Sequence, residues 1–320
     1  MRWGRLQPAN ARLRARWIGR WHMFTGCGTA LVTPFKTDLS LDEAGLRKLV
    51  RRQIEAGINF LVPCGTTGES PTLTRAEHLR VIEIVVEEAK GKTPVLAGAG
   101  GYNTHEVIEL ASDLKRIGVD GILSVTPYYN KPTQEGLYQH YKAIAGAVRL
   151  PVIVYSVQSR TGVNVEPATL ARLAQIENIV GVKEASGNIS QMANVLHEVP
   201  PDFIVLSGDD AITIPLMALG GRGIVSVVSN QIPGPMAQLA QACLHGDFDG
   251  ARKIQARYLP LMNINFIEAN PIPVKAGMAL MGLLEPIWRL PLCPPAAANL
   301  TRIEKVLESL GLLGSVPVAG

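Results

Sequence analysis

A lysine at the end of an apolar run has the clearest chemical potential in this sequence. Lys183 closes the run Ile179–Lys183, in which every other residue is Ile, Val or Gly, so its amine should project into a confined space. An amine shielded from water is a good nucleophile toward a carbonyl carbon, with which it forms a Schiff base. The alternative is a lysine that reaches solvent or pairs with Glu184, because lysines are rarely buried without a partner.

Other polar residues follow further apolar runs and could complete such a site. Tyr155 ends the run before that of Lys183, where its phenol could relay protons, or could pack with a satisfied hydroxyl. Thr66 and Thr67 offer hydroxyls and backbone N–H groups to a small carboxylate, or form an ordinary turn between two glycines. Arg160 could hold a second carboxylate with two parallel hydrogen bonds, or lie on the surface.

The acidic residues and the histidines carry less weight. Asp209 and Asp210 follow Gly208 at another strand end, and we expect them to cap the next helix rather than act as acids. The six histidines include no pair at the spacing of metal ligands. A metal-dependent aldolase or hydrolase is therefore disfavoured.

The elements that must position these residues alternate along the chain. Eight short runs rich in Val and Ile are apolar at consecutive positions, which is typical of strands buried on both faces of a parallel sheet. They are Thr29–Val32, Asn59–Pro63, Pro94–Ala97, Gly121–Val125, Val152–Tyr155, Ile179–Lys183, Phe203–Ser207 and Gly223–Val228. Amphipathic stretches lie between them, and two of these begin with capping-box patterns, Ser40–Glu43 and Thr74–Glu77.

Eight strand–helix units predict a (β/α)8 TIM barrel over residues 23–229, with an open doubly wound sheet as the alternative. In a barrel the loops after the strands converge on one mouth, so the polar residues at the strand ends should meet there. Residues 230–320 carry no strand signal and predict an all-helical C-terminal region. Such a region would shield one side of the barrel or form an oligomer contact.

The distribution of charge argues against one class of function. The formal net charge of the 320 residues is +4, but residues 1–22 contain six arginines and no acidic residue, so the remainder carries −2. Nucleic-acid binding therefore loses its main support. We expect residues 1–22 to be a basic extension, disordered or a misassigned start, with the true start at Met23.

Hydropathy and cysteine usage indicate the compartment. The sequence contains no run of 18 uncharged apolar residues, so no membrane span is expected. The four cysteines are far apart, which fits reduced thiols in the cytoplasm rather than a disulfide or zinc framework.

Five motifs, in order along the chain, carry a family resemblance. They are Gly65–Ser70 (GTTGES), Thr126–Pro132 (TPYYNKP), Tyr155–Gly162 (YSVQSRTG), Gly181–Gly187 (GVKEASG) and Leu206–Asp210 (LSGDD). In these motifs the chain resembles the 4-hydroxy-tetrahydrodipicolinate synthases, also called dihydrodipicolinate synthases, within the Schiff-base pyruvate lyases. The resemblance extends from about Met23 to Gly314.

The resemblance implies a reaction. Pyruvate would condense with the amine of Lys183, and the resulting enamine would attack the aldehyde of L-aspartate 4-semialdehyde to give 4-hydroxy-tetrahydrodipicolinate, the first committed step of lysine and diaminopimelate biosynthesis. Tyr155 would donate and accept protons, relayed through Thr66 and through Tyr129 from a neighbouring subunit. No cofactor and no metal are implied.

The resemblance also implies binding residues and an assembly. Thr67 and the backbone at Val225 would hold pyruvate, Arg160 would hold the semialdehyde carboxylate, and Gly208 would be a further substrate-binding residue. A homotetramer built from two tight dimers is the usual form of the family.

The sequence departs from the family in two places. The family usually has Asn-Val-Pro after the tyrosine, where this chain has Ser156, Val157 and Gln158, in the loop that carries Arg160. At the family's lysine feedback site, the residues that fit regulated members are Ser70, His78, Glu106 and Tyr128. Those that differ are Pro71, Arg75 and Tyr102, so we expect weak or absent inhibition by lysine.

Two alternatives stay open at this point. The first is a sister aldolase that acts on sialic acid or on 2-keto-3-deoxy sugar acids, although Ser159–Gly162 and the pair Tyr128 and Tyr129 favour the synthase. The second is a non-catalytic barrel that binds small keto acids and needs no reactive lysine.

Overall fold

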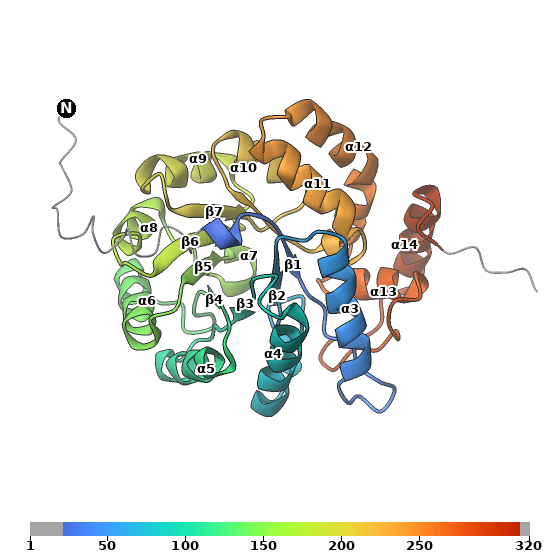
Figure 1. Ribbon diagram of the computed structural model, residues 1–320, viewed down its shortest axis with the longest axis horizontal. Helices are drawn as coiled ribbons and strands as arrows, with labels where there is room; N and C mark the ends of the chain where they lie inside the picture. The colour runs from blue at the N-terminus through green and yellow to red at the C-terminus, as the bar shows by residue number, and fades with distance from the viewer. Residues whose placement is uncertain (1–21, 314–320) are drawn as a thin grey trace, which may run out of the picture.

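The computed structural model describes residues 22–313, so the expected basic extension lies, apart from His22, outside the described residues. Within them, eight parallel strands are hydrogen-bonded in the order β2-β1-β8-β7-β6-β5-β4-β3 (Figure 1). The two ends of this row meet, because Leu61 N donates to Pro94 O and Gly98 N donates to Pro63 O, each at 2.9 Å. The sheet therefore closes on itself, and the predicted TIM barrel is confirmed.

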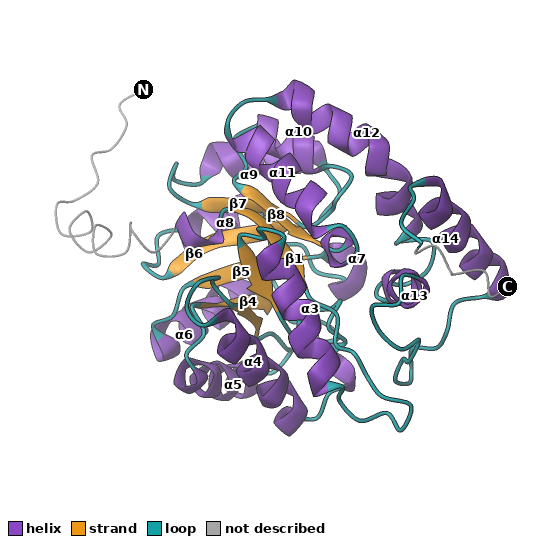
Figure 2. Ribbon diagram, turned by 45° about the vertical axis from the view of Figure 1, so that its right-hand side comes forward, coloured by secondary structure: helices purple, strands orange, loops and turns teal. Residues whose placement is uncertain are grey.

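The strands are short and the helices lie around them (Figures 1 and 2). The strands are β1 (Gly26–Ala30), β2 (Phe60–Val62), β3 (Leu96–Gly98), β4 (Gly121–Val125), β5 (Val152–Ser156), β6 (Ile179–Glu184), β7 (Ile204–Ser207) and β8 (Gly223–Ser226). The helices between them are α3 (Glu43–Glu55), α4 (Arg75–Ala89), α5 (Thr104–Ile117), α6 (Gln134–Val148), α7 (Gln158–Thr161), α8 (Pro167–Leu173), α9 (Ile189–Glu198) and α10 (Thr213–Ala218). The C-terminal helices are α11 (Pro233–Leu244), α12 (Phe248–Ile264), α13 (Ile272–Leu280) and α14 (Ala297–Ser309).

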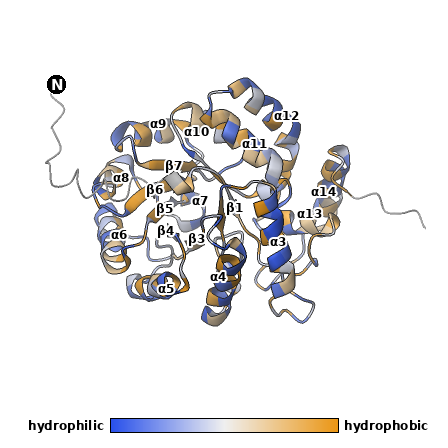
Figure 3. Cartoon of the chain, viewed as in Figure 1, coloured by the Kyte–Doolittle hydropathy of each residue, from blue (hydrophilic) through white to orange (hydrophobic). Residues whose placement is uncertain are grey.

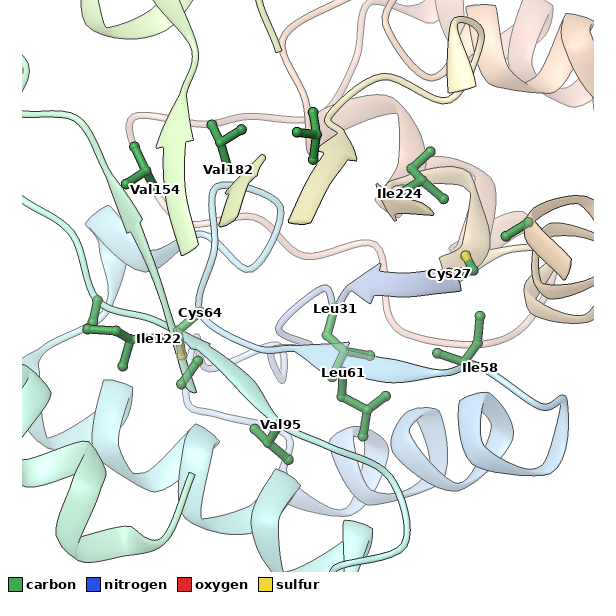
Figure 4. Close-up of a cluster of buried hydrophobic side chains, with 14 of the residues drawn as sticks. Cys27, Leu31, Ile58, Leu61, Cys64, Val95, Ile122, Val154, Val182 and Ile224 are labelled. Carbon is green, nitrogen blue, oxygen red and sulfur yellow. The ribbon is translucent and has the colours of Figure 1, made fainter. Parts of the chain in front are cut away.

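Strand alternation decides which side chains reach the barrel interior, because successive residues of a strand point to opposite faces. Val154 of β5 and Val182 of β6 belong to the cluster that packs between the barrel and its helices (Figure 4). Ile153 and Tyr155, at the alternate positions of β5, belong to a second cluster inside the barrel. Lys183 follows Val182 and therefore faces the interior.

The first strand begins earlier than the sequence predicts. β1 covers Gly26–Ala30 rather than Thr29–Val32, because glycine has a low strand propensity and hides the signal. Only glycine fits at position 28, because a Cβ there would lie 2.0 Å from Cε2 of the buried Phe60 ring and would clash with it. That ring fills the bottom of the barrel edge to face with Phe24, at a centroid distance of 5.7 Å.

One of the two expected capping boxes forms. At the start of α4, Glu77 N donates to Thr74 Oγ1 at 3.2 Å and Thr74 N donates to Glu77 Oε2 at 2.9 Å. The Ser40–Glu43 box is wrong, because Asp42 caps α3 and accepts from Gly45 N at 2.9 Å. Such a cap contributes about 1 kcal/mol to stability.

Helix α3 illustrates how the outer layer is built. Its buried apolar residues, Leu46, Leu49 and Val50, recur at helical spacing, and Figure 3 colours much of the remaining helix as hydrophilic. Among residues 22–313, no helix combines the length and the apolar character that a bilayer span requires.

The C-terminal region is part of the barrel's outer layer. α11 packs against β1 and β8, so it occupies the place of the eighth helix, and α12 packs on α11 (Figure 1). α13 packs against α14 and against the short helix η3 (Val228–Asn230), which follows β8. The segment just before α13 thereby comes close to the mouth of the barrel.

Candidate active site

Lys183 and Tyr155 lie side by side inside the mouth of the barrel. They are direct partners in the pairing of β5 with β6, and Nζ of Lys183 lies 4.2 Å from the centroid of the Tyr155 ring. Only 5% of Lys183 and 7% of Tyr155 is exposed. The amine is thus confined beside the electron-rich face of an aromatic ring.

Glu184 is the neighbour of Lys183 in the chain but not in space. Its carboxylate lies on the helix side of β6, where it accepts hydrogen bonds from Gln191 Nε2 at 2.8 Å and from Ser186 N at 3.3 Å. Burial raises the pKa of Glu184. The alternative of an ion pair between Lys183 and Glu184 is therefore wrong for this structure.

A cavity of about 220 Å³ opens beside Lys183. It brings together six of the expected site residues: Thr66, Thr67, Tyr155, Arg160, Lys183 and Gly208. A Cβ at position 208 would lie 3.1 Å from Cε of Lys183 and 2.6 Å from Cβ of Ala185. Glycine at position 208 therefore leaves room for the side chain of Lys183.

Two of the expected site residues lie outside the lining of this cavity. Val225 lies within β8 with a side chain that is 1% exposed, and Val227, two residues later, lines the cavity instead. Tyr129 is 91% exposed and has a φ of 63°, a left-handed conformation that is unfavourable for a tyrosine. The side chain of Tyr129 therefore makes little contact with its own barrel.

The expectation that both aspartates cap the next helix is wrong, because Ile212 is the N-cap of α10 and no side chain caps that helix. Asp210 instead binds the turn after β8. Its buried carboxylate accepts from Ser226 Oγ at 2.6 Å, from Val227 N at 3.1 Å and from Val228 N at 3.0 Å. It thus fixes the turn after β8, next to the cavity. Burial raises the pKa of Asp210 to about 6. Asp209 accepts from Ala211 N at 2.8 Å in a local turn.

Sequence reasoning missed Asn270, which also lines the cavity. Its Nδ2 donates to Thr67 Oγ1 at 3.0 Å, and its backbone carbonyl accepts from Arg160 Nη2 at 3.2 Å. One residue of the C-terminal region therefore contacts both expected carboxylate-binding groups. Its position before Pro271, within a helical region, carries no signal that separates it from an ordinary loop residue.

These groups together suit a keto acid and a second small anion. The cavity offers one amine as a nucleophile, one phenol, two threonine hydroxyls and one guanidinium. Within residues 22–313, no cluster of three or more His, Cys, Asp or Glu side chains is placed to hold a metal ion.

Comparison with known proteins gives the family. Residues 23–310 match the model of the dihydrodipicolinate synthetase family. The chain belongs to this family. A 4-hydroxy-tetrahydrodipicolinate synthase of Koribacter versatilis is 54% identical over 295 residues, which cover 92% of this chain and 98% of the relative.

Solved structures of dihydrodipicolinate synthases agree in fold. The enzyme of Aquifex aeolicus superposes with a TM-score of 0.90 at 42% identity, covering 92% of this chain and 100% of that one. The chloride-inhibited enzyme of Acinetobacter baumannii, crystallised with pyruvate, gives a TM-score of 0.89 at 43% identity, covering 90% and 99%.

Ser156, which follows Tyr155 in the chain, belongs to a polar network. Ser156 Oγ donates to Asn164 Oδ1 at 3.3 Å and accepts from Val165 N at 3.1 Å. Asn164 Nδ2 donates to Gln191 Oε1 at 2.8 Å, and Gln191 in turn binds Glu184. The segment between Ser156 and Asn164, which contains α7 and Arg160, is thereby tied to Glu184 of β6.

A second cavity, of about 340 Å³, adjoins the first at Thr66 and Tyr155 and contains three of the four residues expected at a lysine site. Ser70, His78 and Tyr128 line it together with Pro71. His78 Nε2 donates to the Gly98 carbonyl at 2.9 Å, and burial lowers the pKa of His78. Glu106 is exposed and accepts from Asn103 Nδ2 at 2.9 Å. The exposed Tyr102 ring packs edge to face on Tyr128 at 5.2 Å.

Proposed function

We propose that this chain condenses pyruvate with L-aspartate 4-semialdehyde to 4-hydroxy-tetrahydrodipicolinate, and that Lys183 is the covalent catalyst. One observation carries the assignment to this residue: Lys183 is 5% exposed, stands beside Tyr155 and opens into the cavity with Thr67 and Arg160. Family membership supports the reaction, and the geometry supports the roles of the residues.

The chemistry begins at the amine. Nζ of Lys183 attacks the C2 carbonyl carbon of pyruvate, and the carbinolamine loses water to give the imine. Loss of a C3 proton turns the imine into an enamine, whose C3 forms a carbon–carbon bond with the aldehyde carbon of the second substrate. Cyclisation through the amine of that substrate releases the lysine. The scheme uses no cofactor and no metal.

Protons must move at each of these steps, and Tyr155 is the group that moves them. Its ring packs against Nζ of Lys183, so its phenol stands at the same cavity wall. Thr66 lines the same cavity and would extend the relay. Tyr129 of the partner subunit would complete the relay, because this tyrosine is exposed in its own protomer.

Both substrates carry a carboxylate, and the protein body without residues 1–22 has a net charge of −2. Local groups must therefore attract them. The hydroxyl and backbone N–H of Thr67 and the backbone near Val225 would bind the pyruvate carboxylate. Arg160 would bind the carboxylate of the semialdehyde, with its guanidinium oriented by the carbonyl of Asn270.

The assembly and the compartment complete the proposal. A homotetramer of two tight dimers would bring Tyr129 of one subunit to the site of the next, and the exposed side chain of Tyr129 supports this arrangement. The cysteines Cys27, Cys64, Cys243 and Cys293 are free thiols, which suits the reducing cytoplasm.

A coupled turnover assay tests the substrate assignment. The chain is given pyruvate with aspartate semialdehyde, with N-acetylmannosamine or with glyceraldehyde, and product formation is followed in each case. We expect turnover with aspartate semialdehyde to exceed that with either sugar aldehyde by at least about 100-fold, the discrimination that a matched charged contact provides. Faster turnover with a sugar aldehyde would assign the chain to a sister aldolase instead.

A further inference from the structure

A fully buried ion pair stands behind the cavity and has no part in the chemistry described above. Glu69, the acidic residue of the GTTGES motif, pairs with Lys275 of α13, and both side chains are 0% exposed. The partners are 206 residues apart in the chain. Nothing in the reaction scheme requires either charge, so the pair needs a separate explanation.

Glu69 ends the turn that carries Thr66 and Thr67. Within this turn, Gly68 N donates to Gly65 O and Glu69 N donates to Thr66 O, each at 3.1 Å. Glu69 has a φ of 55°, in the left-handed region that non-glycine residues rarely adopt. This conformation needs support from the surroundings. The side chain of Lys275 supplies such support at the end of the turn.

The segment that begins α13 contacts the turn at two points. Asn270 binds the hydroxyl of Thr67, and Lys275, five residues later, binds the carboxylate of Glu69. A third contact, from Thr33 Oγ1 to the carbonyl of Gly68 at 2.7 Å, holds the turn from the side of β1. Thr67 and the two residues that follow it are therefore each held by a contact from another segment.

The surroundings of the pair are apolar and aromatic, with one more cation nearby. Nζ of Lys275 lies 4.5 Å from the centroid of the buried Phe35 ring, and the guanidinium of Arg289 lies 4.2 Å from the same centroid. The guanidinium of Arg289 forms a salt bridge with Glu77, with two hydrogen bonds of 2.6 and 2.8 Å. Only its backbone N–H reaches Glu69, at 3.5 Å.

Stability alone is a weak reason for such a pair. The desolvation free energy of two buried charges is about as large as the free energy of their attraction. Proteins in which apolar residues of similar volume replace such a pair are often equally stable. A charge-assisted hydrogen bond differs from apolar packing because it fixes a direction and a distance. At this position it fixes the turn that presents Thr67 to the cavity.

We propose that Glu69 and Lys275 are positioning residues that clamp the substrate-binding turn to the C-terminal region. Their ion pair sets where the hydroxyl and the backbone N–H of Thr67 stand relative to Nζ of Lys183. The clamp should affect binding of the first substrate, pyruvate, because Lys275 bonds to Glu69 in the turn that carries Thr67. Arg160, which would bind the second substrate, bonds to the carbonyl of Asn270. This inference rests on the proposed binding of pyruvate at Thr67.

The double variant Glu69→Gln/Lys275→Met removes both charges and keeps both side-chain volumes. The matched control is Glu135→Gln/Arg172→Met, which removes an exposed ion pair of 2.8 Å between α6 and α8. For each folded variant, the pyruvate KM, the semialdehyde KM and the pyruvate concentration that half-saturates borohydride trapping on Lys183 are measured. A circular-dichroism melt confirms folding.

We expect the double variant to raise the pyruvate KM and the half-saturating pyruvate by the same factor, about 10-fold or more, with the semialdehyde KM within about twofold. The control should leave all three unchanged. A folded double variant with an unchanged pyruvate KM would show that the pair only stabilises the fold, and would overturn the proposal.

A second variant keeps the test decisive if the double variant does not fold. Lys275→Arg retains the charge but replaces the compact ammonium group with a larger, planar guanidinium group. This change should shift the carboxylate of Glu69. It should raise the pyruvate KM about threefold or more at an unchanged semialdehyde KM, and an unchanged pyruvate KM would contradict the clamp. Absence of trapping in the parent chain would contradict the proposed function instead, so the two failures are distinguishable.

Discussion

Tyr155 and Lys183 are register partners on neighbouring parallel strands, so the phenol ring and the amine share one face of the sheet at the mouth of the barrel. The ring contact and the hydroxyl can be separated by substitution. Tyr155→Phe keeps the ring against Nζ and removes only the proton-transfer group.

We expect Tyr155→Phe to lower kcat by about 100-fold or more, because a positioned acid–base group contributes that much. Borohydride trapping of pyruvate on Lys183 should persist, with a slower onset. The measurement is steady-state turnover alongside trapping, each at saturating pyruvate. Full turnover in the variant would remove Tyr155 from the proton relay.

Arg160 should determine affinity for the second substrate. Its guanidinium lines the cavity and is oriented by the carbonyl of Asn270. Loss of two charge-assisted hydrogen bonds, about 3 kcal/mol, predicts that Arg160→Ala raises the semialdehyde KM about 100-fold. Pyruvate trapping should be unaffected, and a variant that instead fails to trap pyruvate would place Arg160 at the first subsite.

Tyr129 should act across a subunit interface. An inactive Lys183→Met variant and a weakened Tyr129→Phe variant are unfolded, mixed and refolded together. If Tyr129 works in trans, half of the sites in each mixed dimer regain both groups, so activity should return to about a quarter of the parent value. If the mixture is no more active than its parts, Tyr129 does not act in this way.

Lysine should inhibit weakly or not at all. Where regulated family members often have asparagine, Tyr102 packs its ring on Tyr128. Arg75 is engaged by Asp113, and Pro71 lines the second cavity without a side-chain donor. Titration of turnover with lysine tests this, with Tyr102→Asn as the variant that should gain sensitivity. Strong inhibition of the parent at micromolar lysine would contradict the prediction.

The folded protein should lose stability through Asp210 as the pH rises. Burial raises the pKa of this carboxyl to about 6, above its value of 3.8 in the unfolded chain, so the folded state binds the proton more tightly. The resulting stabilisation is complete below pH 3.8 and is lost as the pH rises through 6. Between pH 5 and 7.5 the loss is on the order of 1 kcal/mol.

The variant Asp210→Asn isolates this effect. Its amide can accept from Val227 N and Val228 N and donate to Ser226 Oγ, so the turn is preserved while the titration is removed. Urea unfolding of parent and variant is compared at pH 5 and at pH 7.5. The parent should lose more stability than the variant over this interval, and parallel losses would show that Asp210 is not the responsible group.

The barrel and the centre of the site follow from local patterns. Consecutive apolar residues predict the buried strands. Tyr155 and Lys183 could be predicted as site residues because each is a polar residue at the end of an apolar run. The strands and these two site residues depend on residues that are adjacent in the chain, so they can be predicted from the sequence. The glycines of β1 are the exception, because Gly28 is explained only by the Phe60 ring that packs on it.

The rest of the site depends on contacts between distant segments. Asn270 meets Thr67 across 203 residues, and Lys275 meets Glu69 across 206. Asp210 turns away from the helix that follows it because three donors around Ser226 attract its carboxylate. No periodicity or local motif encodes these pairings, since they arise only when the folded barrel brings the ends of different strands and the segment before α13 together.

Reduction of a trapped intermediate tests the central claim most directly. The chain is incubated with borohydride in the presence and absence of pyruvate, digested, and analysed by mass spectrometry, with Lys183→Met as the control. A pyruvate-dependent adduct on Lys183, with Lys275 unmodified as the second buried lysine, is the predicted result. An unmodified Lys183, or an adduct that persists in Lys183→Met, would contradict the account.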